Sequence, residues 1–118
     1  MATYSRILLS GSTNGKAIKI VAVATAGTTL HTAITGTTRF DEVYIWVSNT
    51  SVNPVPLTIE WGGVTDPDCL ICKTVSIPAL SGPTLVIPGL VLNNALVIGA
   101  FAGTANVLLA SGYCNRIL

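Results

Sequence analysis

Charged residues are scarce in this sequence. They make up 9% of its 118 residues, and half of all residues are hydrophobic, whereas an ordinary soluble domain carries about 25% charged residues. So few charges cannot cover the surface of a monomer of this size. Either Thr, Ser, Asn and Gly coat the rest, or other protein surfaces cover much of it. We interpret the deficit as a sign of an oligomer or a lattice, with a neutral, Thr- and Ser-coated monomer as the alternative.

Basic residues are few and dispersed. The net charge is +1 at neutral pH, and no basic run interleaved with aromatic residues occurs. Binding to nucleic-acid phosphates usually requires a concentrated basic patch, so we predict no nucleic-acid partner. The basic residues are Arg6, Lys16, Lys19, Arg39, Lys73 and Arg116.

A long apolar run is also missing. Met1–Ser10 lacks the apolar core of a secretory signal. Thr74–Asn115 carries no charge, but prolines and glycines interrupt it, and its best continuous window, Ala95–Ala110, is about 16 residues long. A membrane-spanning helix needs about 20 mainly apolar residues, so we predict no membrane partner.

The cysteines are odd in number, which favours reduced thiols in a sequence without a secretory signal. Cys69 and Cys72 form a C-x-x-C motif inside a β-branched run, where residues three apart point to opposite faces. A structural zinc site needs four ligands, and the sequence offers three cysteines and one histidine. We interpret Cys69, Cys72 and Cys114 as ordinary buried thiols and predict no metal; a zinc site and a redox pair are the alternatives.

Helical periodicity is nearly absent, while β-branched runs alternate with Gly, Asn, Asp and Pro clusters every 8 to 12 residues or so. Asn14-Gly15 predicts a type I′ hairpin turn between Tyr4–Ser10 and Lys16–Ala24. The further expected runs are Thr28–Ile34, Asp41–Thr50, Val55–Trp61 and Cys69–Ile77.

These patterns predict one all-β domain over residues 1–118. We expect an antiparallel β-sandwich or a jelly-roll-like barrel of about eight strands. An immunoglobulin-like sandwich is the nearest competitor, but the Cys…Trp…Cys order of antibody domains is missing.

The last third of the sequence is apolar on both faces of its expected strands, which indicates cover from both sides. The core supplies one cover, and we expect a neighbouring subunit to supply the other. The runs concerned are Leu85–Ile87, Leu90–Leu92, Leu96–Phe101 and Val107–Ala110. We therefore predict a contact surface made by Leu96, Val97, Ile98 and Phe101, within the uncharged stretch from Thr74 to Asn115.

The two tryptophans have different expected roles. Trp61 continues the inward face of its strand and is expected in the core. Trp46 shares a face with Tyr44 and Glu42, opposite the apolar face of Asp41–Thr50. Because aromatic residues are enriched at interface cores, we predict a second contact patch at Tyr44 and Trp46. Stacking of these rings on a sugar is the alternative.

Catalytic groups do not assemble into a known pattern. His31 is the only histidine, and no acid lies near it in sequence. No nucleophile elbow and no phosphate-binding glycine loop occurs. Asp66-Pro67-Asp68 is typical of a turn rather than of a calcium site. We predict that the protein is not an enzyme and has no cofactor.

The overall pattern resembles the small virion proteins of tailed bacteriophages, of the head-decoration or capsid cement type. The resemblance rests on the opening Tyr4–Ser12, the middle Leu57–Gly63 and the ending Ser111–Ile117. It implies a small β-rich subunit, often trimeric, made in the host cytoplasm and placed on the capsid surface, where it contacts the major capsid protein. A tail or head-fibre subunit and a carbohydrate- or receptor-binding module are the alternatives.

Overall fold

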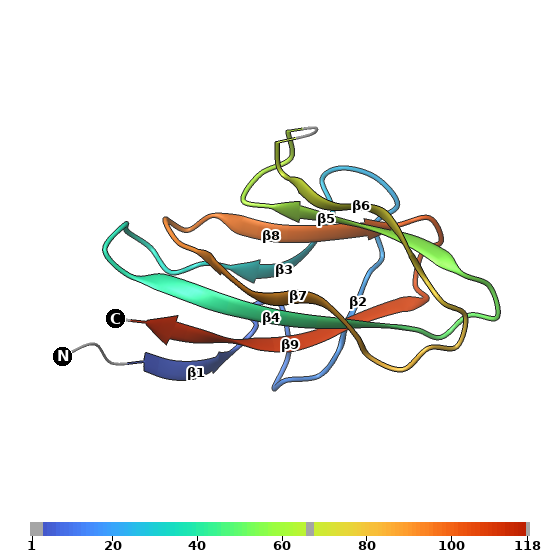
Figure 1. Ribbon diagram of the computed structural model, residues 1–118, viewed down its shortest axis with the longest axis horizontal. Helices are drawn as coiled ribbons and strands as arrows, with labels where there is room; N and C mark the ends of the chain where they lie inside the picture. The colour runs from blue at the N-terminus through green and yellow to red at the C-terminus, as the bar shows by residue number, and fades with distance from the viewer. Residues whose placement is uncertain (1–3, 66–67, 118) are drawn as a thin grey trace.

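Nine β-strands, arranged in two antiparallel sheets, make up the regular structure of the computed structural model, which describes residues 4–65 and 68–117 (Figure 1). The predicted all-β class is confirmed, and no helix occurs in the described residues. The strands are β1 (Tyr4–Leu8), β2 (Ile18–Lys19), β3 (Thr28–Thr32), β4 (Phe40–Asn49), β5 (Val55–Trp61), β6 (Leu70–Ile77), β7 (Thr84–Leu92), β8 (Val97–Ala102) and β9 (Leu108–Ile117).

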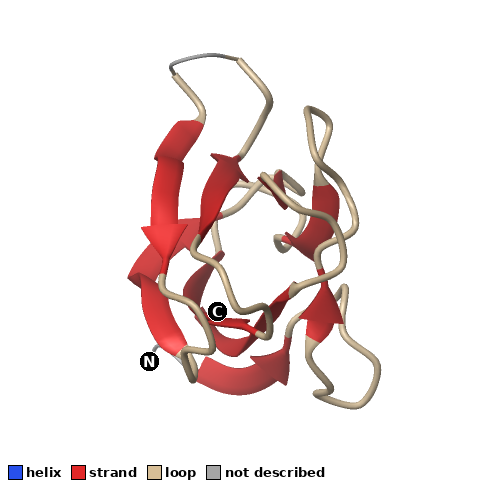
Figure 2. Cartoon of the chain, turned by 90° about the vertical axis from the view of Figure 1, so that its right-hand side faces the viewer, coloured by secondary structure: helices blue, strands red, loops and turns tan. Residues whose placement is uncertain are grey.

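The two sheets lie one over the other and form a β-sandwich. One sheet, sheet A, has the order β1-β9-β4-β7, with β2 also paired to β9. The other, sheet B, has the order β3-β8-β5-β6 and is the upper layer in Figure 1. Seen from the end, the strands surround the interior (Figure 2).

The strand pairing is that of a jelly roll. The pairs β5·β6, β4·β7, β3·β8 and β2·β9 follow one another outward from the β5–β6 hairpin, so residues 18–117 fold back on themselves as one long antiparallel ribbon. The pairs β4·β9 and β5·β8 then wrap this ribbon into two sheets. Double-sheet jelly rolls of this kind occur in capsid proteins and in lectins.

The first predicted hairpin is wrong, although its turn is correct. Asn14 and Gly15 both have positive φ, and the N–H of Lys16 donates to the carbonyl of Thr13, as a type I′ turn requires. However, β1 and β2 do not pair with each other. Both pair with the same long strand, β9, which offers one unpaired edge to two short partners.

The core lies between the sheets and is apolar. The predicted alternation of β4 is confirmed, because Val43, Ile45 and Val47 are fully buried while the residues between them are half-exposed. Trp61 packs against the core, as predicted, but stays partly exposed. Ile59, Ile87, Ile98 and Leu108 complete the centre from the other strands.

Register shifts between paired strands change which side chains face the core. Leu57 pairs with Val75 and Ile59 with Cys72, so β6 has one extra residue near Thr74, whose φ is positive. This places Cys72 against the core and leaves Ile71 41% exposed. An unbroken alternation along the expected run Cys69–Ile77 would put Ile71 and Ile77 on one face, and the bulge breaks this alternation.

A second bulge explains why two predicted apolar runs form one strand. Leu85–Ile87 and Leu90–Leu92 both belong to β7, and Gly89, at φ 100°, is the extra residue between them. Pro88 is tolerated because it lies beside this bulge, on an edge strand.

The described part of the chain has no helix that is long and apolar enough to cross a membrane.

Candidate functional site

The outer face of sheet A carries three aromatic rings that touch one another. The alternation of β4 points Tyr44 and Trp46 outward, and Tyr113 of β9 pairs with Tyr44 in register. The ring centroids of Tyr44 and Tyr113 are 5.2 Å apart, those of Trp46 and Tyr113 6.0 Å, and those of Tyr44 and Trp46 6.4 Å. We call these three residues the aromatic face. The prediction paired Tyr44 with Trp46 but missed Tyr113, because its place depends on the register between β4 and β9.

The rings cover one another's flat sides. Tyr44 is stacked on Tyr113 with an interplanar angle of 28°, and on Trp46 with an angle of 21°. The guanidinium of Arg6 lies 4.6 Å from the centroid of the Tyr113 ring. Tyr44 and Arg6 thus take up ring surface of Tyr113 that a sugar would need for stacking.

Polar side chains hold the rim of the aromatic face in place. Glu42 accepts hydrogen bonds from the Tyr44 hydroxyl at 3.3 Å and from the Asn115 amide at 3.2 Å. Partial burial of the hydroxyl and the nearby Glu42 carboxylate raise the pKa of Tyr44 above its ordinary value. Arg6 donates to Asn115 at 3.5 Å. The rim therefore offers both charge signs beside the rings.

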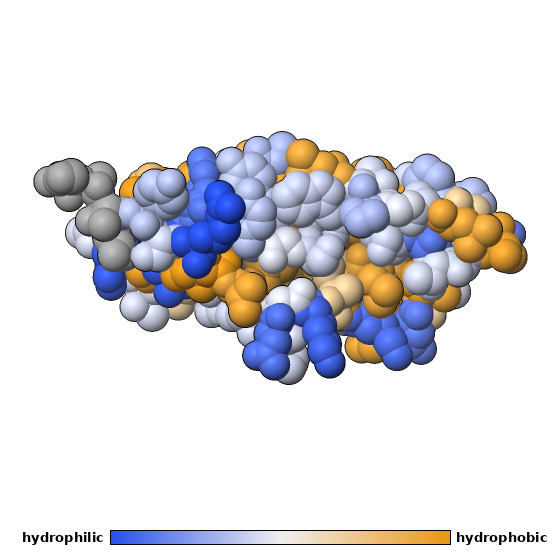
Figure 3. Space-filling view, turned by 90° about the horizontal axis from the view of Figure 1, so that it is seen from below, coloured by the Kyte–Doolittle hydropathy of each residue, from blue (hydrophilic) through white to orange (hydrophobic). Residues whose placement is uncertain are grey.

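Apolar side chains extend the aromatic face across the sheet. Leu8 pairs with Tyr113 and is 52% exposed, and Leu85 pairs with Trp46 and is 46% exposed. Val91, opposite Glu42, is also exposed. Seen from the side of β1 and β9, hydrophobic and weakly polar groups cover most of the surface, and strongly hydrophilic groups form a few clusters (Figure 3). Exposed apolar area of this kind usually marks a contact surface.

The first predicted contact patch lies elsewhere, on sheet B, and one member does not reach the surface. Leu96 and Val97 are about two-fifths exposed, and Phe101 is half-buried. Ile98 is fully buried in the core of this chain and pairs with Trp61. It has no surface to offer to a second subunit, so its place in the predicted contact surface is wrong.

The chain itself covers part of β8, for which a neighbouring subunit was expected. Ala22 accepts a hydrogen bond from the N–H of Ala102, and Gly27 lies so close that a Cβ would collide with the backbone of Ala100. Val23 and Pro56 line a small hollow together with Phe101. Segment 20–27 thus provides cover that the sequence pattern assigned to a partner.

Exposed large hydrophobic side chains also occur well outside Thr74–Asn115. Those inside this stretch are Val75, Leu80, Leu85, Leu90, Val91, Leu96 and Val97, and those outside it are Tyr4, Leu8, Val21, Val23, Val52, Val64 and Ile71. The uncharged third is therefore not the sole apolar surface of the described residues.

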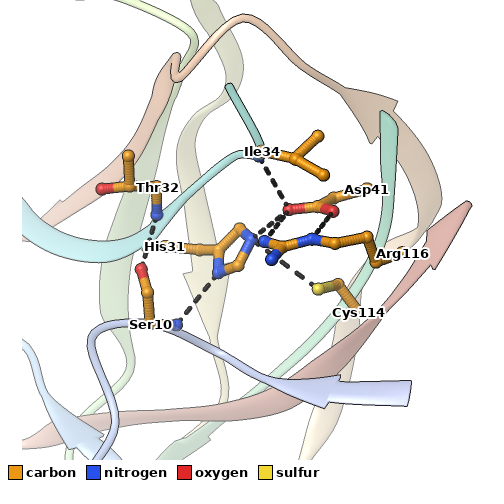
Figure 4. Close-up of polar contacts among 7 residues, drawn as sticks. All are labelled: Ser10, His31, Thr32, Ile34, Asp41, Cys114 and Arg116. Carbon is orange, nitrogen blue, oxygen red and sulfur yellow. Dashed lines mark hydrogen bonds and ion pairs between the residues drawn. The ribbon is translucent and has the colours of Figure 1, made fainter. Parts of the chain in front are cut away.

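A buried polar cluster joins the two sheets (Figure 4). His31 of β3 lies with its Nε2 2.8 Å from Oδ2 of Asp41 on β4, and Arg116 of β9 donates to both oxygens of this carboxylate at 2.8 and 3.0 Å. The N–H of Ile34 also donates to Oδ2 at 3.1 Å. Proximity in sequence did not reveal Asp41 as a partner of His31. The available signal was its place on the inward face of β4, where a charge needs a partner.

The electrostatics of this cluster are those of a buried ion pair. Burial alone would raise the pKa of Asp41, but the hydrogen bonds from Arg116 and His31 outweigh it and lower this pKa below its ordinary 3.8. The same bond raises the pKa of Arg116. Burial, and after it the Asp41 carboxylate, raise the pKa of the Cys114 thiol to about 11.

The cluster has candidate metal-ligand atoms, but its hydrogen bonds do not fit an ion. Ligand atoms of His31, Asp41 and Cys114 lie within 4.8 Å of one another. The N–H of Ser10 donates to Nδ1 of His31 at 3.0 Å, so this nitrogen carries no proton and the ring proton lies on Nε2. An ion on Nε2 would move that proton to Nδ1, against the Ser10 donor. Arg116 already occupies both carboxylate oxygens.

The same arrangement does not match a catalytic triad. In a triad the nucleophile and the orienting acid contact opposite ring nitrogens. Here the Cys114 sulfur, 3.7 Å away, and the Asp41 carboxylate both face Nε2 of His31. All three side chains are fully buried. We interpret the cluster as a structural tie between the sheets.

The remaining sequence candidates do not form a site with this cluster. Cys69 lies in the turn before β6 and is half-buried, and Cys72 lies on β6, where burial raises its thiol pKa. Asp68 is exposed, and Asp66 and Pro67 lie outside the described residues.

Comparisons of this chain with protein-family models, with curated proteins and with solved structures find no match.

Proposed function

We propose that this protein is a non-enzymatic structural subunit of a virion, of the head-decoration type, that assembles through its aromatic face. The observation that carries the proposal is the row of Tyr44, Trp46 and Tyr113 on the outside of sheet A, flanked by Leu8 and Leu85. Aromatic residues at the centre of a patch with a polar rim are typical of protein contacts.

The scarcity of charge supports the same proposal. A free monomer gains solubility from charged side chains, and this chain has 9% charged residues. A subunit held in a lattice can tolerate such a surface, because neighbouring proteins cover it. Its partners under this proposal are copies of itself, in a homo-oligomer such as a trimer, and the major capsid protein at the capsid surface.

The jelly-roll fold is compatible with this role but does not select it, since the fold also occurs in lectins. The geometry of the rings discriminates better between a protein contact and a glycan-binding site. A lectin-type platform needs an open ring face for stacking, whereas Tyr44 and Arg6 both lie against the Tyr113 ring. Protein contact is therefore our first proposal and glycan binding the second. A tail or head-fibre subunit would use the same kind of contact.

Light scattering coupled to size-exclusion chromatography tests the assembly. We expect an oligomer at micromolar concentration, and we expect Trp46→Glu to dissociate it, because an unpaired charge in a dry contact costs several kcal/mol. Val97→Glu, at a partly exposed position of sheet B, and Val52→Glu, at a position 76% exposed, are matched controls. Dissociation by Val97→Glu alone would show that the subunits contact each other through the first predicted patch, at Leu96, Val97 and Phe101, and not through the aromatic face.

Binding to capsids tests the partner. Purified shells of a tailed phage that lack their decoration protein, taken from the phage whose genome encodes this chain, should bind the wild-type chain and not Trp46→Glu. A clean monomer without affinity for shells would refute the proposal. Reproducible binding on a glycan array that is lost on Trp46→Ala would favour the second proposal instead.

A further inference from the structure

A small pocket opens on the outer side of sheet B, away from the aromatic face. It has a volume of about 100 Å³. Glu60 of β5 pairs with Gly99 of β8, which in turn pairs with Thr29 of β3. Because Gly99 has no side chain, a hollow remains between its two neighbours on the sheet. Glycine within a strand often marks such a place. The lining residues are Ala26, Gly27, Thr29, Glu60, Gly63, Val64, Val97 and Gly99.

The pocket contains a carboxylate that is only half satisfied. Glu60 is 2% exposed, and its Oε1 accepts a hydrogen bond from the N–H of Gly27 at 2.8 Å. Its Oε2 has almost no accessible surface and accepts no hydrogen bond in the described structure, so a ligand meets this oxygen only when the Glu60 carboxylate turns toward the pocket. A buried acid with a vacant oxygen is costly, and the sequence supplies no cation beside it among the residues that line the pocket.

We propose that this pocket binds an alkylammonium group, with Glu60 as its counter-ion. Apart from Thr29, the remaining lining is small and apolar, so it suits a short aliphatic stem. Val64 and Val97 would contact this stem while the ammonium meets the carboxylate. The volume corresponds to about three water molecules, which matches a two- or three-carbon amine or the end of a lysine side chain.

The geometry favours an ammonium over other cations. A guanidinium binds best to both oxygens of a carboxylate, and Gly27 already occupies Oε1. Calcium takes six to eight oxygen ligands, as a rule, and one carboxylate and one threonine hydroxyl among glycine, alanine and valine cannot supply them with side chains. An ammonium is a compact charge that can use one oxygen.

Two sources could supply this group: a free small amine, or a lysine side chain presented by a protein. We would titrate the ¹⁵N-labelled full chain with n-propylammonium and, separately, with Nα-acetyl-lysine amide, following the amide signals of Gly27 and Gly99. Saturable shifts with both ligands would support the pocket and indicate that lysine fits. Shifts with propylammonium alone would support the pocket and assign it to free amines.

Variants assign the effect to Glu60. We expect Glu60→Gln to weaken binding about tenfold or more, because a charge-assisted hydrogen bond is lost while the amide oxygen can keep the Gly27 bond. Asp68→Asn removes one carboxylate charge at an exposed residue that does not line the pocket, and should bind as the wild type does. Gly99→Ala keeps the charge but fills the hollow, since its Cβ would lie 3.7 Å from Oε1 of Glu60 without backbone strain; it too should weaken binding.

Three results would overturn the proposal: no saturable shift, equal binding by Glu60→Gln, or equal binding of the neutral analogue n-propanol. If Glu60→Gln does not fold, Gly99→Ala takes its place in the test, and binding by this variant equal to that of the wild type would overturn the proposal. The proposal is independent of the proposed function, because the pocket and the aromatic face lie on different sheets.

Discussion

Arg116 and Asp41 form a two-point ion pair across two neighbouring strands, although 75 positions separate them in the sequence. They pair in register on β9 and β4. The Asp41 carboxylate is fully buried, and the Arg116 side chain is 27% exposed. His31 reaches the same carboxylate from the opposite sheet. The ion pair therefore supports the pairing of β4 with β9, and through His31 it also connects sheet A to sheet B.

Removing the arginine should destabilise the protein strongly. Arg116→Met keeps most of the aliphatic stem but leaves Asp41 buried beside His31 without its cation. We expect a loss of about 2 to 3 kcal/mol in the free energy of unfolding, measured by urea denaturation. Arg39→Met is the control, because Arg39 is exposed, and should change stability by less than about 0.5 kcal/mol. Equal losses in the two variants would contradict this role of the pair.

Stability should fall in acid because of Asp41. Its pKa is lowered in the folded state relative to 3.8, so below that value the unfolded chain binds a proton that the folded chain does not. This contribution is complete above the unfolded pKa and disappears as the pH falls through the folded pKa. The midpoint of urea unfolding should decrease below about pH 4. Asp41→Asn should be less stable at neutral pH and show a smaller decrease; an unchanged slope would disprove the assignment.

The cysteines should differ in their reactivity. The thiolate is the reactive form, and the Cys114 thiol, with a pKa of about 11 and no exposed surface, should resist N-ethylmaleimide at neutral pH until the chain unfolds. Cys69 is partly exposed and should react first in the folded protein. Mass spectrometry after timed labelling, with and without denaturant, measures this order. Rapid labelling of Cys114 in the folded protein would show that the cluster opens locally.

Close contact between β4 and β9 should make Gly112 intolerant of a side chain. A Cβ at this position would fall on the carbonyl oxygen of Tyr44, so Gly112→Ala must push the two strands apart. We expect a loss of about 1 to 3 kcal/mol, as for other overpacked sites, in thermal or urea unfolding. Gly82→Ala is the matched control, because nothing lies within 4 Å of its added Cβ. A neutral Gly112→Ala would mean that the strands can separate freely.

Local pattern was sufficient for the features that depend on adjacent residues. The alternation of Val43, Ile45 and Val47 predicted the inward face of β4, and it also placed Tyr44 and Trp46 outside. The turn at Asn14-Gly15 followed from the positive φ that these residues tolerate. The β-branched runs and the missing helical period predicted the all-β class.

Local pattern failed where a partner strand or a bulge decides the outcome. The turn at Asn14-Gly15 suggested that its flanking runs pair, but β9 binds both of them instead. β6 and β7 have register shifts, at Thr74 and Gly89 among other places, which break the alternation along these strands. Ile98 looked like surface because its run is apolar throughout, and the wrapping of β8 between β3 and β5 buried it.

The sequence by itself therefore determined the fold class, the faces of its regular strands and the scarcity of charge, since these depend on residue types and on spacing along the chain. Only the tertiary structure decided which distant side chains meet. It brought Tyr113 to Tyr44, His31 and Arg116 to Asp41, and Gly27 to Glu60. Strand pairing is non-local, and the free energy of burying a polar group depends on the partner that the fold supplies.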